Sequence, residues 1–165
     1  MSFTRQIGCA CGAVRLRFEG EPAAAALCHC ETCRLFYGVV VWAATAWDAA
    51  CMAVDADGDA LGRHAHPTKR MARHFCRRCG DVLYGTNRLG MRVVPNALFM
   101  RAHDGALPAA LRPTMHLFYR VRVLDLDDAL PKYLDGWDGP LWDGPSCDAP
   151  SRGGPPHTPD APAAP

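Results

Sequence analysis

The sequence lacks long apolar runs and any excess of charge of one sign. No apolar stretch approaches the roughly 20 residues that a transmembrane helix needs, and residues 1–6 lack the apolar core of a secretory signal. The 18 Lys and Arg residues nearly balance the 17 Asp and Glu residues, which leaves a formal net charge of +1. Nucleic acids and anionic membranes bind basic surfaces. We therefore expect a cytoplasmic protein without a nucleic-acid or membrane partner.

Helical periodicity is also scarce. Residues 31–37 and 106–112 predict two short helices, which cannot organise a helical bundle. Short segments that alternate apolar and polar residues predict strands instead, at 14–18, 38–44, 50–54, 71–75, 82–85, 91–94 and 116–123. We predict a mainly β fold, a sandwich or barrel with short helices, whose core includes Trp42, Trp47, Phe75, Phe99 and Phe118.

Large apolar side chains are missing from residues 144–165, which are rich in Gly, Pro and Ala. Such a segment has no apolar face with which to cover a core. The whole chain of 165 residues has the length of one ordinary domain. We expect a folded domain over residues 1–143 and a flexible tail over 144–165.

Cysteine, in contrast, is abundant. Disulfides do not persist in a reducing cytosol, so nine cysteines indicate metal ligation or thiol chemistry. Cys51 lies in an apolar segment, where we expect a buried free thiol. Cys147 lies in the predicted tail. The other seven fall into three groups, which are Cys9 with Cys11, Cys28 with Cys30 and Cys33, and Cys76 with Cys79.

The first and third groups predict a closed structural zinc site. Two cysteines separated by one or two residues form a metal-binding knuckle, and Gly12 and Gly80 supply the positive φ at which such turns close. Two knuckles together supply four thiolates to a tetrahedral ion. We assign Cys9, Cys11, Cys76 and Cys79 to this zinc, and expect it to clamp two distant edges of one sheet.

The second group predicts a catalytic zinc, because three thiolates leave one corner of a tetrahedron open. Cys33 lies in the first turn of a predicted helix, whose dipole favours a thiolate. Zinc bound by Cys28, Cys30 and Cys33 would carry a charge of about −1 and be a weak Lewis acid toward water. It is better suited to bind a thiol and present the sulfur to an electrophile.

Other interpretations remain open for this site. His29 or His74 could fill the fourth corner and make both sites structural. His29 sits between two ligands, so its side chain would point away from the metal. His74 shares a strand face with Cys76 and could reach across to the open corner. The basic stretch 63–78 could offset thiolate charge and hold substrate carboxylates, or it could simply be a solvated face; its cations are Arg63, Lys69, Arg70, Arg73, Arg77 and Arg78.

Three motifs together resemble one known family. They are G-C-A-C-G-A-V-R at 8–15, C-H-C-E-T-C-R at 28–34 and R-H-F-C-R-R-C-G-D-V-L-Y at 73–84, followed by D-D-A-L-P-K-Y at 127–133. From about residue 6 to 136 the chain resembles the glutathione-dependent formaldehyde-activating enzyme family, also called the CENP-V/GFA domain. Leu124 is a departure, because members often have tryptophan there.

The resemblance implies an Mss4-like, mostly antiparallel β fold with two zinc ions, one structural and one catalytic, on the same cysteines as above. It also implies a carbon–sulfur lyase that joins glutathione to formaldehyde to give S-(hydroxymethyl)glutathione. Our hypothesis is that a thiol, in the first place glutathione, attacks a small aldehyde at the three-cysteine zinc. The alternative is a non-catalytic zinc-binding module that binds or carries glutathione or a protein partner.

Overall fold

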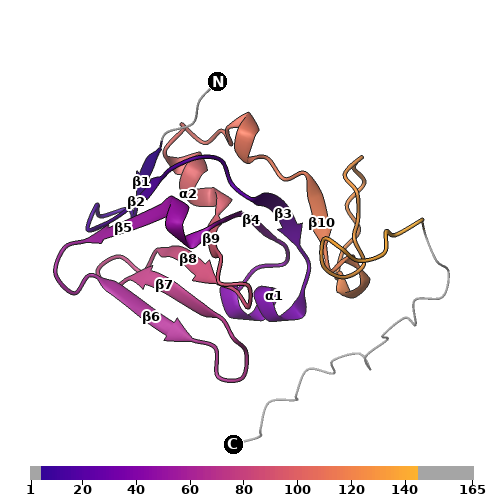
Figure 1. The fold of residues 1–165 in the computed structure, drawn as a ribbon, viewed down its shortest axis with the longest axis horizontal. Coiled ribbons are helices and arrows are strands. Elements are labelled where there is room, and N and C mark those ends of the chain that lie inside the picture. The colour runs from indigo at the N-terminus through magenta and orange to yellow at the C-terminus, as the bar shows by residue number, and fades with distance from the viewer. Residues whose placement is uncertain (1–4, 145–165) are drawn as a thin grey trace, which may run out of the picture.

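The computed structural model describes residues 5–144, whose ten strands form two sheets (Figure 1). The smaller sheet has the order β1-β2-β5 and consists of β1 (Gln6–Gly8), β2 (Val14–Phe18) and β5 (Met52–Ala56). The larger has the order β10-β3-β4-β9-β8-β7-β6. Its strands are β3 (Ala24–Cys28), β4 (Trp42–Trp47), β6 (Leu61–Ala65), β7 (Ala72–Cys76), β8 (Val82–Thr86), β9 (Arg92–Pro95) and β10 (Met115–Leu117).

All neighbouring strands pair antiparallel except β3 and β10, which are parallel. The helices are short: α1 (Glu31–Tyr37), α2 (Asn96–Arg101) and three 3₁₀ turns, η1 (Ala49–Cys51), η2 (Ala109–Leu111) and η3 (Tyr119–Val121). The predicted mainly β fold with short helices is confirmed.

The element predictions were right where the local pattern is strong. Residues 14–18 form β2 and residues 31–37 form α1, with the predicted bounds. The prediction of one strand over residues 116–123 was wrong. Phe118 takes a left-handed conformation (φ 58°) that ends β10 and starts η3. Residues 106–112 contain only the turn η2, and β1, β3, β6 and α2 were missed.

The core lies between the smaller sheet, the larger sheet and α2. Phe18 of β2 packs at 4.6 Å from the Trp47 ring and 5.2 Å from the Phe99 ring, measured between centroids. Trp47 and Phe99 are fully buried, as predicted, and Trp42 is nearly so. Phe75 and Phe118 are only half-buried, so their prediction as core residues was wrong.

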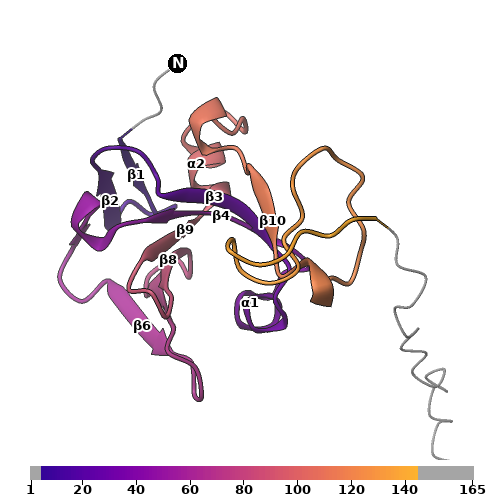
Figure 2. The same cartoon turned by 45° about the vertical axis from the view of Figure 1, so that its right-hand side comes forward.

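Residues 122–144 continue past β10 on the side of the larger sheet away from β6 (Figures 1 and 2). They reach back to the sheet through a bridge between His116 and Lys132. The predicted tail lies outside the described residues, apart from Gly144, and so does Cys147. No helix within residues 5–144 is long and apolar enough to cross a membrane.

Candidate metal centres

Two knuckles bring the first four cysteines together. Cys9 and Cys11 lie between β1 and β2, and Cys76 and Cys79 lie at the turn from β7 to β8. Their four sulfurs lie within 4.8 Å of one another, with Cys9 and Cys76 buried. The Sγ atom of Cys11 is 3.5 Å from that of Cys9 and 3.6 Å from that of Cys76. Tetrahedral zinc with thiolates at about 2.3 Å requires sulfurs about 3.8 Å apart, so this donor set fits zinc.

The position of this cluster corrects one expectation. Because β2 belongs to the smaller sheet and β7 and β8 to the larger, a metal here would join two different sheets rather than two edges of one. Gly12 and Gly80 take the predicted positive φ, 75° and 80°. Their amides close the knuckles onto the carbonyls of Cys9 (3.0 Å) and Cys76 (2.8 Å).

Asp81 fastens the two knuckles to each other. One of its carboxylate oxygens, Oδ2, accepts from the Ala10 amide at 2.7 Å and from Arg101 Nη2 at 2.8 Å. The backbone N–H groups of Asp81 and Cys11 lower the pKa of Cys79 to about 7. A thiolate, the form that binds metal, is therefore favoured at Cys79. Sequence reasoning missed Asp81, although it directly follows the knuckle.

The three-cysteine cluster is built where β3 meets α1. Cys28 ends β3, Cys30 is the N-cap of α1 and Cys33 lies in the first turn. The three sulfurs are half-buried and lie within 4.8 Å of one another. The Cys33 amide donates to Cys30 Sγ at 3.2 Å, so Cys30 caps the helix with its sulfur. All eight described cysteines are free.

The three thiols of this cluster shift one another's pKa in opposite directions. Hydrogen bonds from the thiols of Cys28 and Cys33 lower the pKa of Cys30 to about 3, whereas the same contacts raise the pKa of Cys33. Hydrogen bonding with Cys30 likewise raises the pKa of Cys28 to about 12. The preference for a Cys33 thiolate at the metal site stays a prediction. Three crowded thiols cannot all ionise unless a cation compensates them, which is what a divalent metal does.

Neither predicted histidine belongs to this cluster. His29 is fully buried and turned to His116, with 2.9 Å between its Nε2 and His116 Nδ1. The His74 ring stacks on Tyr84 with 4.2 Å between centroids. Within residues 5–144, the cluster therefore contains three sulfurs and no imidazole or carboxylate ligand.

The three cysteines lie in the wall of a cavity of about 430 Å³. The paired strands β3 and β4 contribute small side chains to it, since Ala24 pairs with Ala46 and Ala26 with Ala44. Large apolar residues contribute other parts of the wall, among them Trp42, Met91 and Phe118. Leu124, the departure noted in the sequence, does not line the cavity.

Only part of the basic stretch faces this cavity. Lys69 and Arg70, in the connection from β6 to β7, line it. Arg73 instead donates to the Phe36 carbonyl at 2.6 Å, and Arg78 pairs with Asp57 at 3.8 Å. Arg88, Trp137 and Asp138 are among the lining residues that were not predicted from the sequence.

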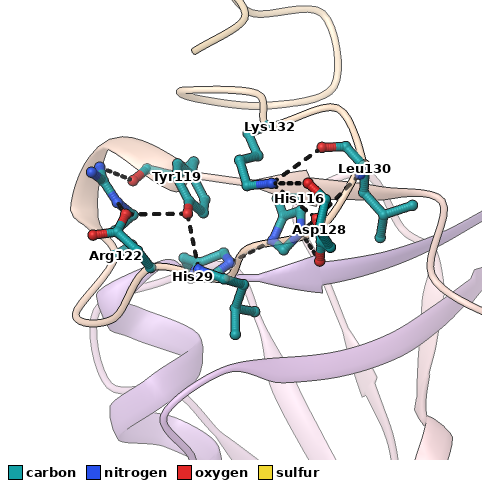
Figure 3. A network of polar contacts seen from close by, with 9 residues as sticks. His29, His116, Tyr119, Arg122, Asp128, Leu130 and Lys132 are labelled. Atoms are coloured by element: carbon teal, nitrogen blue, oxygen red, sulfur yellow. Dashed lines mark hydrogen bonds and ion pairs between the residues drawn. The ribbon is translucent and has the colours of Figure 1, made fainter. Parts of the chain in front are cut away.

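His29, which lies between Cys28 and Cys30 in the sequence, belongs to a polar network with His116, Asp128 and Lys132 (Figure 3). His116 Nε2 is 3.0 Å and 3.1 Å from the two oxygens of Asp128, and Lys132 Nζ is 2.9 Å from one of them. Burial lowers the pKa of His29 to about 4, so its ring is neutral. Desolvation opposes ionisation of Asp128, but hydrogen bonds from Lys132 and His116 prevail and lower its pKa.

The chain matches a known protein family over most of its length. The family described as glutathione-dependent formaldehyde-activating enzyme matches residues 4–121. The chain belongs to this family. That match includes both cysteine clusters and ends before Asp128 and Lys132. A crystal structure of a Rhodobacter sphaeroides protein is similar at 24% identity and a TM-score of 0.47, over 62% of this chain and 97% of that one. No curated protein matches significantly.

Proposed function

We propose that this protein joins a thiol, in the first place glutathione, to a small aldehyde such as formaldehyde. The product would be S-(hydroxymethyl)glutathione, so the enzyme would be classed as a carbon–sulfur lyase for the reverse reaction. The observation that carries the proposal is a cluster of three thiols in the wall of a cavity that also has cations in its wall. The family supports the choice of glutathione and formaldehyde.

Two zinc ions are proposed, one at each cluster. Cys9, Cys11, Cys76 and Cys79 would hold the structural ion, and Cys28, Cys30 and Cys33 the catalytic one. When bound, the catalytic zinc would lower the pKa of a substrate thiol and keep its sulfur nucleophilic. Thiolate metal sites and a glutathione substrate suit a reducing compartment, so we assign the reaction to the cytoplasm.

The chain's own residues would position the reactants. Lys69, Arg70 and Arg88 would hold the two carboxylates of glutathione by charge-assisted hydrogen bonds. The apolar walls would limit the access of water to the reacting sulfur. In the step itself a sulfur–carbon bond forms, the carbonyl π bond breaks, and the thiol proton ends on the former carbonyl oxygen. No oxidant or reductant is needed.

The test is the rate at which glutathione and formaldehyde exchange with their adduct, measured by NMR at substoichiometric protein. Wild type should accelerate exchange in both directions, and Cys30→Ser should return it to the uncatalysed rate. Cys51→Ser, which changes a half-buried cysteine outside both clusters, is the matched control and should keep full activity. Equal rates for wild type and folded Cys30→Ser would reject the proposal. Saturation at one equivalent without acceleration would indicate a glutathione carrier.

A further inference from the structure

His29 anchors the three-cysteine loop to a neighbouring segment, and its ring points to His116. His29 lies between these two cysteines, is fully buried, and packs edge-on against Tyr119 with 4.9 Å between ring centroids. Its backbone N–H donates to the Leu117 carbonyl at 2.9 Å. Both the backbone and the ring of His29 are therefore fastened to β10 and the residues that follow it.

His116 is the middle of this attachment. Its backbone N–H donates to the Pro131 carbonyl at 2.8 Å, and its carbonyl accepts from the Tyr133 amide at 3.0 Å. Its ring spans from His29 to Asp128 and is fully buried. A shift of His116 would displace His29, and with it the two flanking sulfurs.

Hydrogen bonds to Asp128 fasten the far end of this chain. An ionised carboxylate only accepts hydrogen bonds, so His116 Nε2 donates to Asp128. The other nitrogen of the His116 ring, Nδ1, lies 2.9 Å from His29 Nε2, so one hydrogen bond joins the two rings. Lys132, only 7% exposed, fixes the carboxylate by donating to its side chain and to its backbone carbonyl, each at 2.9 Å.

We propose that Asp128, His116 and His29 form a positioning chain that sets the geometry of the three-cysteine metal site. The inference rests on the proposed function, because it requires a metal at Cys28, Cys30 and Cys33. It assigns a positioning role to residues outside the cysteine cluster. Asp128 and Lys132 lie beyond residue 121, where the family match ends, so a segment distant in sequence would hold the catalytic loop.

The test measures metal affinity rather than activity. Zinc competition with a chromophoric chelator, and the charge-transfer bands of the cobalt-loaded protein, report each site in the same molecule. His116→Phe keeps a ring but removes both nitrogens, and partners behind metal ligands are worth roughly 10- to 100-fold in affinity. We expect His116→Phe to weaken the three-cysteine site by about that factor, with the four-cysteine site unchanged.

Three further variants make the result specific. His116→Asn places an amide near the position of Nδ1 and should restore most of the affinity. Asp128→Asn, at a partly exposed residue, is the second variant should His116→Phe fail to fold, and we expect it to weaken the same site. Thr45→Val removes a buried hydrogen bond from Trp47 at 3.0 Å in β4, away from the network, and should change neither site.

The failures can be told apart. Unchanged affinity of the three-cysteine site in folded His116→Phe and Asp128→Asn would overturn the positioning chain and leave the proposed function standing. An equal loss at both metal sites would also overturn it, because that result indicates general destabilisation. If wild type holds no metal on Cys28, Cys30 and Cys33, the proposed function fails together with this inference.

Discussion

Cys30 has two separate roles, as the sulfur that caps α1 and as a proposed ligand of the three-cysteine metal site. Serine is a good N-cap but a poor ligand for zinc, whereas alanine can neither cap a helix nor bind zinc. Substitutions at this one residue can therefore separate helix capping from metal binding.

We predict that Cys30→Ser and Cys30→Ala both lose the metal of the three-cysteine site, as counted by native mass spectrometry. Cys30→Ala should be less stable than Cys30→Ser by about 1 kcal/mol, the usual worth of an N-cap, in urea unfolding. Equal stability of the two variants would show that the sulfur is not a cap in solution. Retention of two metals by Cys30→Ser would remove Cys30 from the ligand set.

Asp81 leads to a prediction about pH. Desolvation opposes its ionisation, but Arg101 and the Ala10 amide outweigh it and lower the pKa. A carboxylate with a depressed folded pKa stabilises the protein above its unfolded pKa of about 3.9, and this contribution is lost as pH falls through the folded value. Asp81→Asn should cost about 1–2 kcal/mol at pH 7, and the difference from wild type should shrink below about pH 4.

The measurement is urea unfolding of wild type and Asp81→Asn across this pH range. Asp55→Asn is the control, because Asp55 is 55% exposed and pairs with Arg15 at 2.9 Å on the surface, where ion pairs contribute less than about 1 kcal/mol. A pH-independent cost for Asp81→Asn would contradict the assigned role of its charge.

At the scale of the elements, predictions from sequence succeeded where one segment carries its own signal. The alternation in Val14, Leu16 and Phe18 identifies β2, because each of these side chains is buried on one face. The knuckle cysteines were found because their spacing is local. The network of His29, His116 and Asp128 was missed, since isolated residues 87 and 12 positions apart carry no pattern before the chain is folded. Helix α2 was missed because it is short and follows a strand directly at Pro95.

The connection between β6 and β7 yields a prediction about substrate. Lys69 and Arg70 line the cavity there, so the double variant Lys69→Ala/Arg70→Ala should raise the KM for glutathione about tenfold or more, the worth of a charge-assisted hydrogen bond. The value of kcat and the metal content should change little. Arg78→Ala, in the same basic stretch but paired with Asp57, is the control.

A thiol without carboxylates, such as 2-mercaptoethanol, supplies the contrast. With 2-mercaptoethanol as the substrate, the KM should change little in the Lys69→Ala/Arg70→Ala variant and equally little in Arg78→Ala. A tenfold effect on 2-mercaptoethanol would show that the loop acts on the metal site or on the fold, and not on the carboxylates of glutathione.

For the whole molecule, the two clusters have different consequences. The four-cysteine cluster joins the smaller sheet to the larger, so a metal there links two layers that share one core. Substituting Cys76, which is fully buried, should therefore prevent stable folding, whereas substituting Cys33 should leave a folded protein. Circular dichroism and thermal unfolding of Cys76→Ser and Cys33→Ser compare the two directly. Equal loss of structure in both variants would contradict this division of roles.

The most direct measurement is a crystal structure of the zinc-loaded protein with glutathione, with the metals located by anomalous scattering. We predict two zinc peaks, one among four cysteine sulfurs and one bound by Cys28, Cys30, Cys33 and the glutathione sulfur at about 2.3 Å. A single peak, or a second zinc whose fourth ligand is a protein side chain, would contradict the proposed catalytic site.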